Sequence, residues 1–327
     1  MDLAETLKLA VLAVAIEACI GYPQNLFHVI GHPVSWIGRL VALADQALNN
    51  KNRSFAARSA RGSAALILLL LASATAAHLV GAGITAVGLP PPMGIILTAL
   101  IGSSLIAQRS LAAHVLAVAT GLEKGIQEGR KAAAQIVGRN VELLDASGGA
   151  SAAIESLAEN YSDGVVAPAF FLAIGGLAGA ACYKTINTAD SMIGHRTERY
   201  AAFGFASAKL DDFVNYCPAR LSALWIIIAS LFTKGASFKN AWRTVRHDAR
   251  HHPSPNAGWP EAAFAGALGL RIGGPRIYGD VNVHAAWIGT GNRASINDII
   301  RALVLYRRAC AVHWLALAMT ALAISLA

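Results

Sequence analysis

Acidic side chains recur at helical spacing in the middle of the chain. Glu155 and Glu159 are four residues apart and so share one face of a helix, and Asp163 follows one turn later. Like charges at this spacing repel unless a cation or a basic partner compensates. Three carboxylates beside the amide of Asn160 suit Mg²⁺, which prefers one or two carboxylates plus phosphate oxygens of a substrate. A solvated helix face with arginine partners has the same spacing, so both interpretations stay open.

A second group mixes acids, bases and amides between two apolar segments, over residues 187–215. Ionisable groups at membrane depth are costly and usually functional. The arginines predict bidentate contacts to phosphate or carboxylate, and the aspartates are candidate metal ligands. An internal salt-bridge network is the alternative. The candidates are Asn187, Asp190, Arg196, Arg199, Lys209, Asp211 and Asp212.

Turn-forming residues interleaved with polar ones mark a third region, 252–261, which is followed by Gly273-Gly274. Glycine-rich backbone can approach a ligand closely and offer N–H groups to an anion. Asn256 and Glu261 are the polar candidates in this region. An ordinary ordered loop is the alternative interpretation.

Familiar metal and nucleotide motifs are missing from the sequence. His247 and His251 have the i, i+4 spacing of helical zinc ligands, but no Glu follows His247 and Pro253 ends the helix. The four cysteines form no CxxC pair, so they indicate neither zinc nor a redox motif. Walker A, GxGxxG and GxSxG patterns are absent, so any nucleotide site is not a familiar one.

The elements that must position these groups are apolar. Hydrophobic residues make up 55% of the 327 residues and charged residues 14%, against roughly 25% charged in soluble domains. No charged residue lies between Arg61 and Arg109, which leaves room for two spans joined at the consecutive prolines 90–92. We expect one all-α domain over 1–327, a polytopic membrane helical bundle with cytoplasmic helical and loop segments. Membrane segments are predicted near 5–22, 63–86, 93–117, 164–183, 219–233 and 309–327.

The net charge of +8 is better explained by membrane topology than by nucleic acid. Basic residues gather in loops that stay in the cytoplasm, which predicts that 24–62 and 234–308 are such loops. Gly175-Gly176 and Pro168 argue against a plain rod over 164–183, and only 13 uncharged residues follow Arg220. We expect these two segments to be buried or re-entrant, with the polar residues between them facing a cytoplasmic cavity.

Taken together, these segments resemble the CobD/CbiB family, the adenosylcobinamide-phosphate synthases. The motifs follow the family's order over about residues 20–310. They are His32-Pro-Val, Ile37-Gly-Arg39, Val137-Gly-Arg139, Glu155-Ser-Leu-Ala-Glu-Asn160, Ser162-Asp-Gly-Val-Val-Ala-Pro168, Asn187-Thr-Ala-Asp-Ser-Met192, Gly194-His-Arg-Thr-Glu-Arg-Tyr200, Lys209-Leu-Asp-Asp212, Pro218-Ala-Arg220 and Ser254-Pro-Asn-Ala-Gly-Trp-Pro-Glu261. Tyr22 and Asn140 stand where the family commonly has Asp, so no role of those two carboxylates carries over.

The resemblance implies an ATP-dependent amide ligation in cobalamin biosynthesis. The amine would be (R)-1-amino-2-propanol phosphate, or aminopropanol itself, and the acid the free propionate of adenosylcobyric acid, giving adenosylcobinamide phosphate. Mg²⁺ would be the cofactor and ATP the co-substrate. The protein would be a multi-pass protein of the cell inner membrane with its active site facing the cytoplasm. Other cobalamin-assembly enzymes are open as partners, and nucleic acid is not expected.

The resemblance also implies roles for the candidate residues. The acids Glu155, Glu159 and Asp163 would bind Mg²⁺ or deprotonate the amine. Further metal ligands would be Asp190, Asp211 and Asp212. Substrates and phosphates would be held by His32, Arg39, Asn160, Asn187, Arg196, Arg199, Lys209, Asn256 and Glu261. Two alternatives remain, a transporter of an anionic solute and a non-catalytic membrane sensor or assembly partner.

Overall fold

The chain is a helical membrane protein. The computed structural model describes residues 2–138, 140–274, 276–278, 281–283 and 286–327. The described residues contain five helical segments long and apolar enough to cross a membrane, Asn25–Leu48, Phe55–Ala86, Pro91–Lys124, Ala146–Ile193 and Ile296–Leu326. A pair of shorter helices bent by 44°, Phe205–Val214 and Tyr216–Leu231, would make a sixth. The predicted all-α polytopic class is confirmed.

Two compact units make up the chain, and each combines separated stretches of sequence. Unit 1 comprises Met1–Ala107, Ala167–Asn215 and Leu317–Ala327. Unit 2 comprises Gln108–Val166 and Tyr216–Ala316. The single domain over 1–327 stays a prediction.

Unit 1 is built from seven complete helices among the residues described. They are α1 (Leu3–Cys19), α2 (Gln24–Ile30), α3 (Pro33–Leu48), α4 (Phe55–Ala86), α5 (Pro91–Ser103), α9 (Ala167–Ile193) and α10 (Phe205–Val214). Local sequence signals explain several starts. Asp2 and Glu5 form a capping box on α1, and Ser54 caps α4. The proline turn at 90–92 opens α5, as predicted.

The expectation of a loop over 24–62 was wrong, because α2, α3 and the start of α4 occupy it. An apolar stripe at helical spacing explains α3. Val41 is buried on it, and Ile37 and Ala44 pack against the same core. Arg39 is exposed on α3, Lys51 and Arg53 lie between α3 and α4, and Arg58 is buried within α4, so basic residues here are compatible with helical structure.

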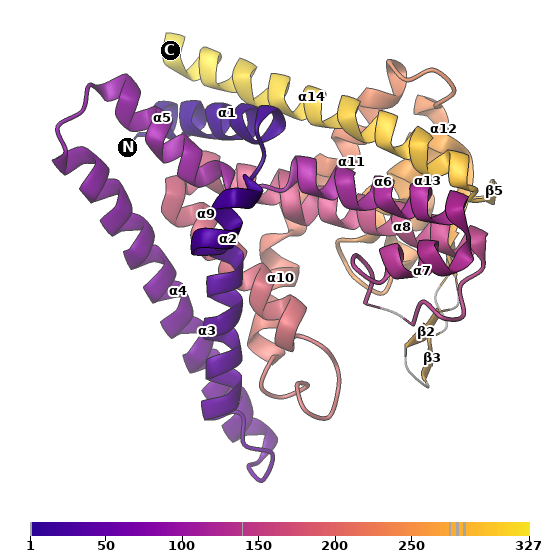
Figure 1. Ribbon diagram of the computed structural model, residues 1–327, viewed down its shortest axis with the longest axis horizontal. Coiled ribbons are helices and arrows are strands. Elements are labelled where there is room, and N and C mark those ends of the chain that lie inside the picture. The colour runs from indigo at the N-terminus through magenta and orange to yellow at the C-terminus, as the bar shows by residue number, and fades with distance from the viewer. Residues whose placement is uncertain (1, 139, 275, 279–280, 284–285) are drawn as a thin grey trace. The chain divides into compact units, whose positions relative to one another are not determined.

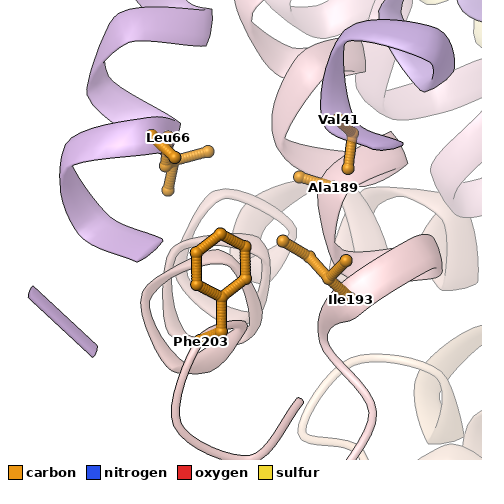
Figure 2. Close-up of a cluster of buried hydrophobic side chains, with 6 residues drawn as sticks. Val41, Leu66, Ala189, Ile193 and Phe203 are labelled. Carbon is orange, nitrogen blue, oxygen red and sulfur yellow. The ribbon is translucent and has the colours of Figure 1, made fainter. Parts of the chain in front are cut away.

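The core of unit 1 joins three helices. Val41 of α3, Leu66 of α4, and Ala189 and Ile193 of α9 surround Phe203 (Figure 2). Both α4 and α9 lie against α3 (Figure 1). The approach is closest at Gly62, where a Cβ would stand 1.8 Å from the carbonyl oxygen of Phe203. Any side chain at position 62 would therefore push the segment after α9 away from α4.

Helix α9 is broken as its glycines predicted. Gly176 has φ 57° and ψ −155°, outside the helical region, so α9 consists of two helical pieces joined at a kink. Pro168 lies in the first turn of α9, where its missing N–H costs little. A π-helical turn, η1 (Ser162–Val166), precedes it. Segment 164–183 is therefore not a plain rod, although whether it crosses a membrane fully stays a prediction.

Unit 2 contains helices and short strands. Its helices are α6 (Gln108–Lys124), α7 (Ile126–Ala133), α8 (Ala146–Tyr161), α11 (Tyr216–Leu231), α12 (Phe238–Asp248), η2 (Ala249–His251), α13 (Gly258–Leu268) and most of α14 (Ile296–Leu326). The strands are β1 (Leu270–Gly273), β2 (Arg276–Tyr278), β3 (Val281–Val283), β4 (Trp287–Ile288) and β5 (Asn292–Arg293). Strand β1 pairs antiparallel with β4 and parallel with β5, and β2 pairs with β3.

The long basic loop predicted over 234–308 was also wrong. Helix α12 places Ala241 and Val245 inward and its basic residues outward, and α13 is buried along its whole length. Helix α14 begins at Ile296, well before the predicted position 309. Helix α8 packs against both α6 and α13 in unit 2, and Glu155 of α8 is buried in this unit whereas Glu159 is exposed.

Candidate functional site

A connected polar network links α9 to the end of α10 in unit 1. The hydroxyl of Tyr183 donates to Oδ1 of Asn215 (2.9 Å), and Nδ2 of Asn215 donates to Oδ2 of Asp211 (2.9 Å). The side chain of Asn187 also interacts with Asp211, and Nζ of Lys184 donates to Oδ1 of Asn187 (3.2 Å). We call these five residues the Asp211 network.

Acids gather around this network. The like charges of Asp190 and Asp212 lie close enough to Asp211 to repel its negative charge. Asp211 is buried, and its Oδ1 accepts no regular hydrogen bond from the residues that the structure describes. A buried carboxylate among like charges is costly unless a cation or a proton compensates. Carboxylate and amide oxygens are the donor types that Mg²⁺ prefers, so by donor type these residues match the cation implied by the sequence.

Backbone geometry fixes the end of α9 beside these acids. The amide of Gly194 donates to the carbonyl of Asp190 (2.7 Å), which ends the helix. A Cβ at position 194 would meet Oδ1 of Asp190 at 1.8 Å. The glycine therefore lets the Asp190 carboxylate fold against the chain.

His32 begins α3 at the edge of the same region. Its Nδ1 accepts a hydrogen bond from the amide of Val34 (3.2 Å), and its ring packs edge-on against Tyr22 at 4.5 Å. Lys184 of the Asp211 network lies close enough to interact electrostatically with His32. Arg39 is exposed on α3. Unit 1 thus brings His32 close to the network through Lys184.

The basic candidates of the 195–209 segment differ in their surroundings. Arg196 and Lys209 are exposed. Arg199 donates to Oδ2 of the buried Asp45 (2.5 Å), and this hydrogen bond raises the pKa of its guanidinium above the ordinary value. The buried Arg58 of α4 donates to the carbonyl of Arg199. Arg199 is therefore held as part of the scaffold, whereas Arg196 and Lys209 face solvent.

The acids of α8 in unit 2 do not share one environment. Glu155 is only 5% exposed, and its Oε1 accepts hydrogen bonds from the Ser151 hydroxyl (2.7 Å) and the Gly273 amide (2.9 Å). Glu159 is exposed, and Asp163 is half-buried in the π-helical turn η1. The structure therefore gives Glu155 a role in fixing β1 that its spacing did not indicate.

An arginine outside the predicted site residues organises the 252–261 region. Arg220 donates to Oδ1 of Asn256 (2.8 Å) and to the carbonyl of Pro255 (3.2 Å). Its guanidinium also lies 3.6 Å from the ring centre of Tyr216 and 4.5 Å from that of Trp259. The family motif Pro218-Ala-Arg220 was the sequence feature that could have identified Arg220 as a site residue.

Two histidines of unit 2 lie beside buried carboxylates. Nε2 of His252 is 3.7 Å from Oε1 of Glu261, with both side chains buried. Atoms of His247, Asp248 and His251 that could bind a metal lie within 4.8 Å of one another. The Asp248 carboxylate, however, already contacts Nδ1 of His247 (2.5 Å) and accepts the amide of Gly289 (2.7 Å). The absence of a zinc site here stays a prediction.

The remaining candidates near the family motifs form local contacts. Nδ2 of Asn160 donates to the carbonyl of Ser156 (2.9 Å), so this amide is tied back onto α8. Oδ1 of Asn140 accepts the amide of Glu142 (2.9 Å), a turn contact that an Asp would also make. Arg139 of the Val-Gly-Arg motif lies outside the described residues.

Comparison with known proteins covers nearly the whole chain. Relatives named "Cobalamin biosynthesis protein CobD" include one from Sinorhizobium sp, 45% identical over 315 residues (95% of this chain, 97% of the relative). Others are from Rhizobium meliloti (strain 1021), 45% identical over 323 residues (98% of each chain), and Rhodobacter capsulatus, 45% identical over 303 residues (92% and 93%). No solved structure matches. Residues 10–306 match the family described as CobD/Cbib protein, and the chain therefore belongs to this family.

Proposed function

We propose that this protein acts in cobalamin biosynthesis as the ligase that joins (R)-1-amino-2-propanol phosphate, or aminopropanol, to the free propionate of adenosylcobyric acid. The relatives that support this proposal carry the name of a cobalamin biosynthesis protein. The observation that carries it is the Asp211 network with the neighbouring Asp190 and Asp212, in which carboxylates, amides and a lysine gather between α9 and α10. Ionisable groups at membrane depth cost free energy and usually serve a function.

The reaction needs activation because oxide is a poor leaving group from a carboxylate. An oxygen of the propionate would attack the γ-phosphorus of ATP, releasing ADP and leaving an acyl phosphate. The amine nitrogen would then attack the acyl carbon, inorganic phosphate would leave, and a base would accept the proton from nitrogen. One ATP is therefore converted to ADP and phosphate for each amide formed.

Asp190, Asp211 and Asp212 are the proposed holders of Mg²⁺. When bound, this ion would neutralise charge on the phosphoryl group being transferred. Asn187 and Asn215 would keep the Asp211 carboxylate in place through the contacts already described. The like charges and the buried Oδ1 of Asp211 support this assignment.

Other residues have proposed roles that follow from their exposure. Glu159 and Asp163 are candidate bases for the amine, since neither is fully buried. Arg196 and Lys209 are candidate phosphate ligands with exposed cationic groups. Glu155 is proposed as a positioning residue, because Oε1 holds the Gly273 amide. A location in the cell inner membrane, with the reaction centre toward the cytoplasm, is proposed from the basic segments of the chain.

Reconstitution tests the function directly. Purified protein in lipid nanodiscs would receive adenosylcobyric acid, MgATP and either aminopropanol phosphate or aminopropanol. We expect one ADP per amide formed and no amide without ATP, with the faster amine identifying the substrate. Unchanged corrinoid in every mixture would refute the ligase assignment. Passage of an unmodified solute into proteoliposomes would favour the transporter instead.

A further inference from the structure

Unit 2 contains a cavity of about 310 Å³ where the start of α8 faces the small sheet β4-β1-β5. Its polar lining comes from Ser147 and Ser151 of α8, Arg271 of β1 and Arg293 of β5, and Trp287 of β4 forms an aromatic wall. The volume is at the lower end of the range for small-molecule sites. None of these residues belongs to the Asp211 network or to the predicted site.

The cavity carries two guanidinium groups. The Arg271 guanidinium lies 4.7 Å from the ring centre of Trp287. Arg293 donates to both carboxylate oxygens of Asp145, at 3.0 and 3.2 Å. Both arginine side chains are exposed, so a ligand can reach them. Guanidinium groups with nearby hydroxyl donors are typical of sites for phosphoryl oxygens.

Two residues of the cavity lining share one buried acceptor. Ser151 and Gly273 both line the cavity, and both donate to Oε1 of the buried Glu155. This carboxylate therefore ties α8 to β1 at the cavity. A ligand in the cavity would meet a fixed set of donors rather than a loose surface loop.

Asp145 is the one acid in the lining. Its carboxylate caps α8 by accepting the Gly148 amide (2.6 Å), and this hydrogen bond, with help from Arg293, lowers the pKa of Asp145. The acid therefore stays ionised at neutral pH and competes with any anion for Arg293. Its removal should strengthen anion binding, whereas removal of either arginine should weaken it.

We propose that the Arg271–Arg293 cavity binds a phosphoryl group of a substrate. This inference rests on the proposed function, whose two phosphate-bearing substrates are a nucleoside triphosphate and an aminoalkyl phosphate. The shared chemistry is a tetrahedral oxyanion held by two guanidinium groups and the Ser147 hydroxyl. A nucleotide would add stacking of its base on Trp287, which the smaller phosphate lacks.

Equilibrium binding to the purified full-length protein tests the proposal, with MgATP and aminopropanol phosphate titrated separately by calorimetry. For at least one ligand, the double variant R271Q/R293Q should bind about 30-fold or more weakly, because charge-assisted hydrogen bonds are lost. Asp145→Asn should bind about threefold or more tightly, since Asn also caps helices well. Loss for MgATP alone identifies the nucleotide as the occupant, and loss for aminopropanol phosphate alone identifies the amine.

Two controls make the test specific. Arg243→Gln removes the same charge from an exposed arginine that lines a different cavity of unit 2, and binding should stay within about twofold of wild type. R271K/R293K keeps both charges and should retain more affinity than R271Q/R293Q, because the proposal assigns the binding to the two positive charges. The proposal is overturned if wild type binds neither ligand, if R271Q/R293Q binds both normally, or if Arg243→Gln weakens binding equally.

The ligation assay separates this inference from the proposed function. Normal amide formation by R271Q/R293Q, with unchanged KM for both phosphate-bearing substrates, would refute the cavity and leave the ligase intact. Binding that follows the predicted pattern, in a wild-type protein that forms no amide, would refute the ligase and keep the cavity.

Discussion

Buried carboxylates have different hydrogen-bond partners in the two units. In unit 2, Glu155 accepts the amide of Gly273, and Asp248 accepts the amide of Gly289. In unit 1, Asp211 accepts from the side chain of Asn215 and lies near two further acids. A carboxylate bound to backbone amides already has its charge compensated, whereas a buried carboxylate among acids needs a cation or a proton to offset the repulsion. Acid density alone therefore does not locate chemistry in this protein.

The glycines explain why unit 2 needs such anchors. Gly273 and Gly289 have φ of 78° and 79°, a left-handed backbone that other residues avoid. Each turn is flanked by short strands that pair over only two residues. A buried carboxylate accepts a hydrogen bond from the amide of each glycine and so holds these short strands in place. A direct part of Glu155 in the reaction stays a prediction.

The largest expected effect comes from Asp211→Asn, which tests whether Asp211 differs in function from the backbone-bound carboxylates of unit 2. The variant keeps the volume of the side chain and removes its charge, so amide formation should fall at least about 100-fold while the protein stays folded. Ligation rate and thermal unfolding would be measured together. Glu128→Gln, on an exposed residue paired with Lys131, should leave the rate unchanged. A ligation rate for Asp211→Asn within threefold of wild type would contradict a role of Asp211 in the reaction.

Two substitutions of Glu155 separate anchoring from charge. Glu155→Ala leaves the Ser151 hydroxyl and Gly273 amide without their acceptor, which should lower the free energy of unfolding by about 1–3 kcal/mol. Glu155→Gln keeps an acceptor oxygen and should lose less than half of that. Denaturant unfolding of both variants provides the measurement. Wild-type stability for Glu155→Ala would remove the anchoring role.

Asp45 provides the same test inside unit 1. It accepts from Nδ2 of Asn49 (2.7 Å) and from Arg199, and it is buried. We expect Asp45→Ala to cost about 1–3 kcal/mol of unfolding free energy, with KM values for the ligation close to those of wild type. A large rise in KM without loss of stability would instead place Arg199 in substrate binding.

The smallest effect concerns Asp145 and pH. Loss of the helix cap in Asp145→Ala should cost about 1 kcal/mol at pH 7. The pKa of Asp145 is lowered from its ordinary value of 3.8, so its contribution is fully present above that value and disappears as pH falls through the lower folded pKa. The stability difference between the two proteins should therefore be constant from pH 7 to 5 and shrink only below about 3.8. A decline already between pH 6 and 5 would contradict this account.

Local signals in the sequence predicted local structure well. The proline turn before α5 and the break of α9 at Gly176 follow from backbone chemistry that needs no distant partner. The prediction of a loop over 24–62 was wrong because it gave the basic residues more weight than the helical spacing of the apolar residues in α3. The early start of α14 was missed because the charge-free stretch begins only after Arg307 and Arg308, whereas the first turns of α14 contain the ion pair of Asp298 and Arg301.

Distant contacts account for most of what was missed at the site. Glu155 meets Gly273 across 118 positions, and Arg220 meets Asn256 across 36, so neither contact has a local signature. The link from Asn187 to Asp211 was closer to prediction, because α9 and α10 are neighbours in sequence. Tyr183 was not predicted, since it ends the apolar stretch 164–183 that the sequence identifies with the membrane, and Lys184, the residue directly after that stretch, was also not predicted.

The central claim is that the acids around Asp211 hold a divalent cation, and Mn²⁺ binding followed by electron paramagnetic resonance tests it most directly. Purified wild-type protein should bind one Mn²⁺ that Mg²⁺ displaces. Asp211→Asn should weaken that binding by at least about tenfold, whereas Glu155→Gln should leave it unchanged. Equal Mn²⁺ affinity in the wild type and in Asp211→Asn would contradict the account.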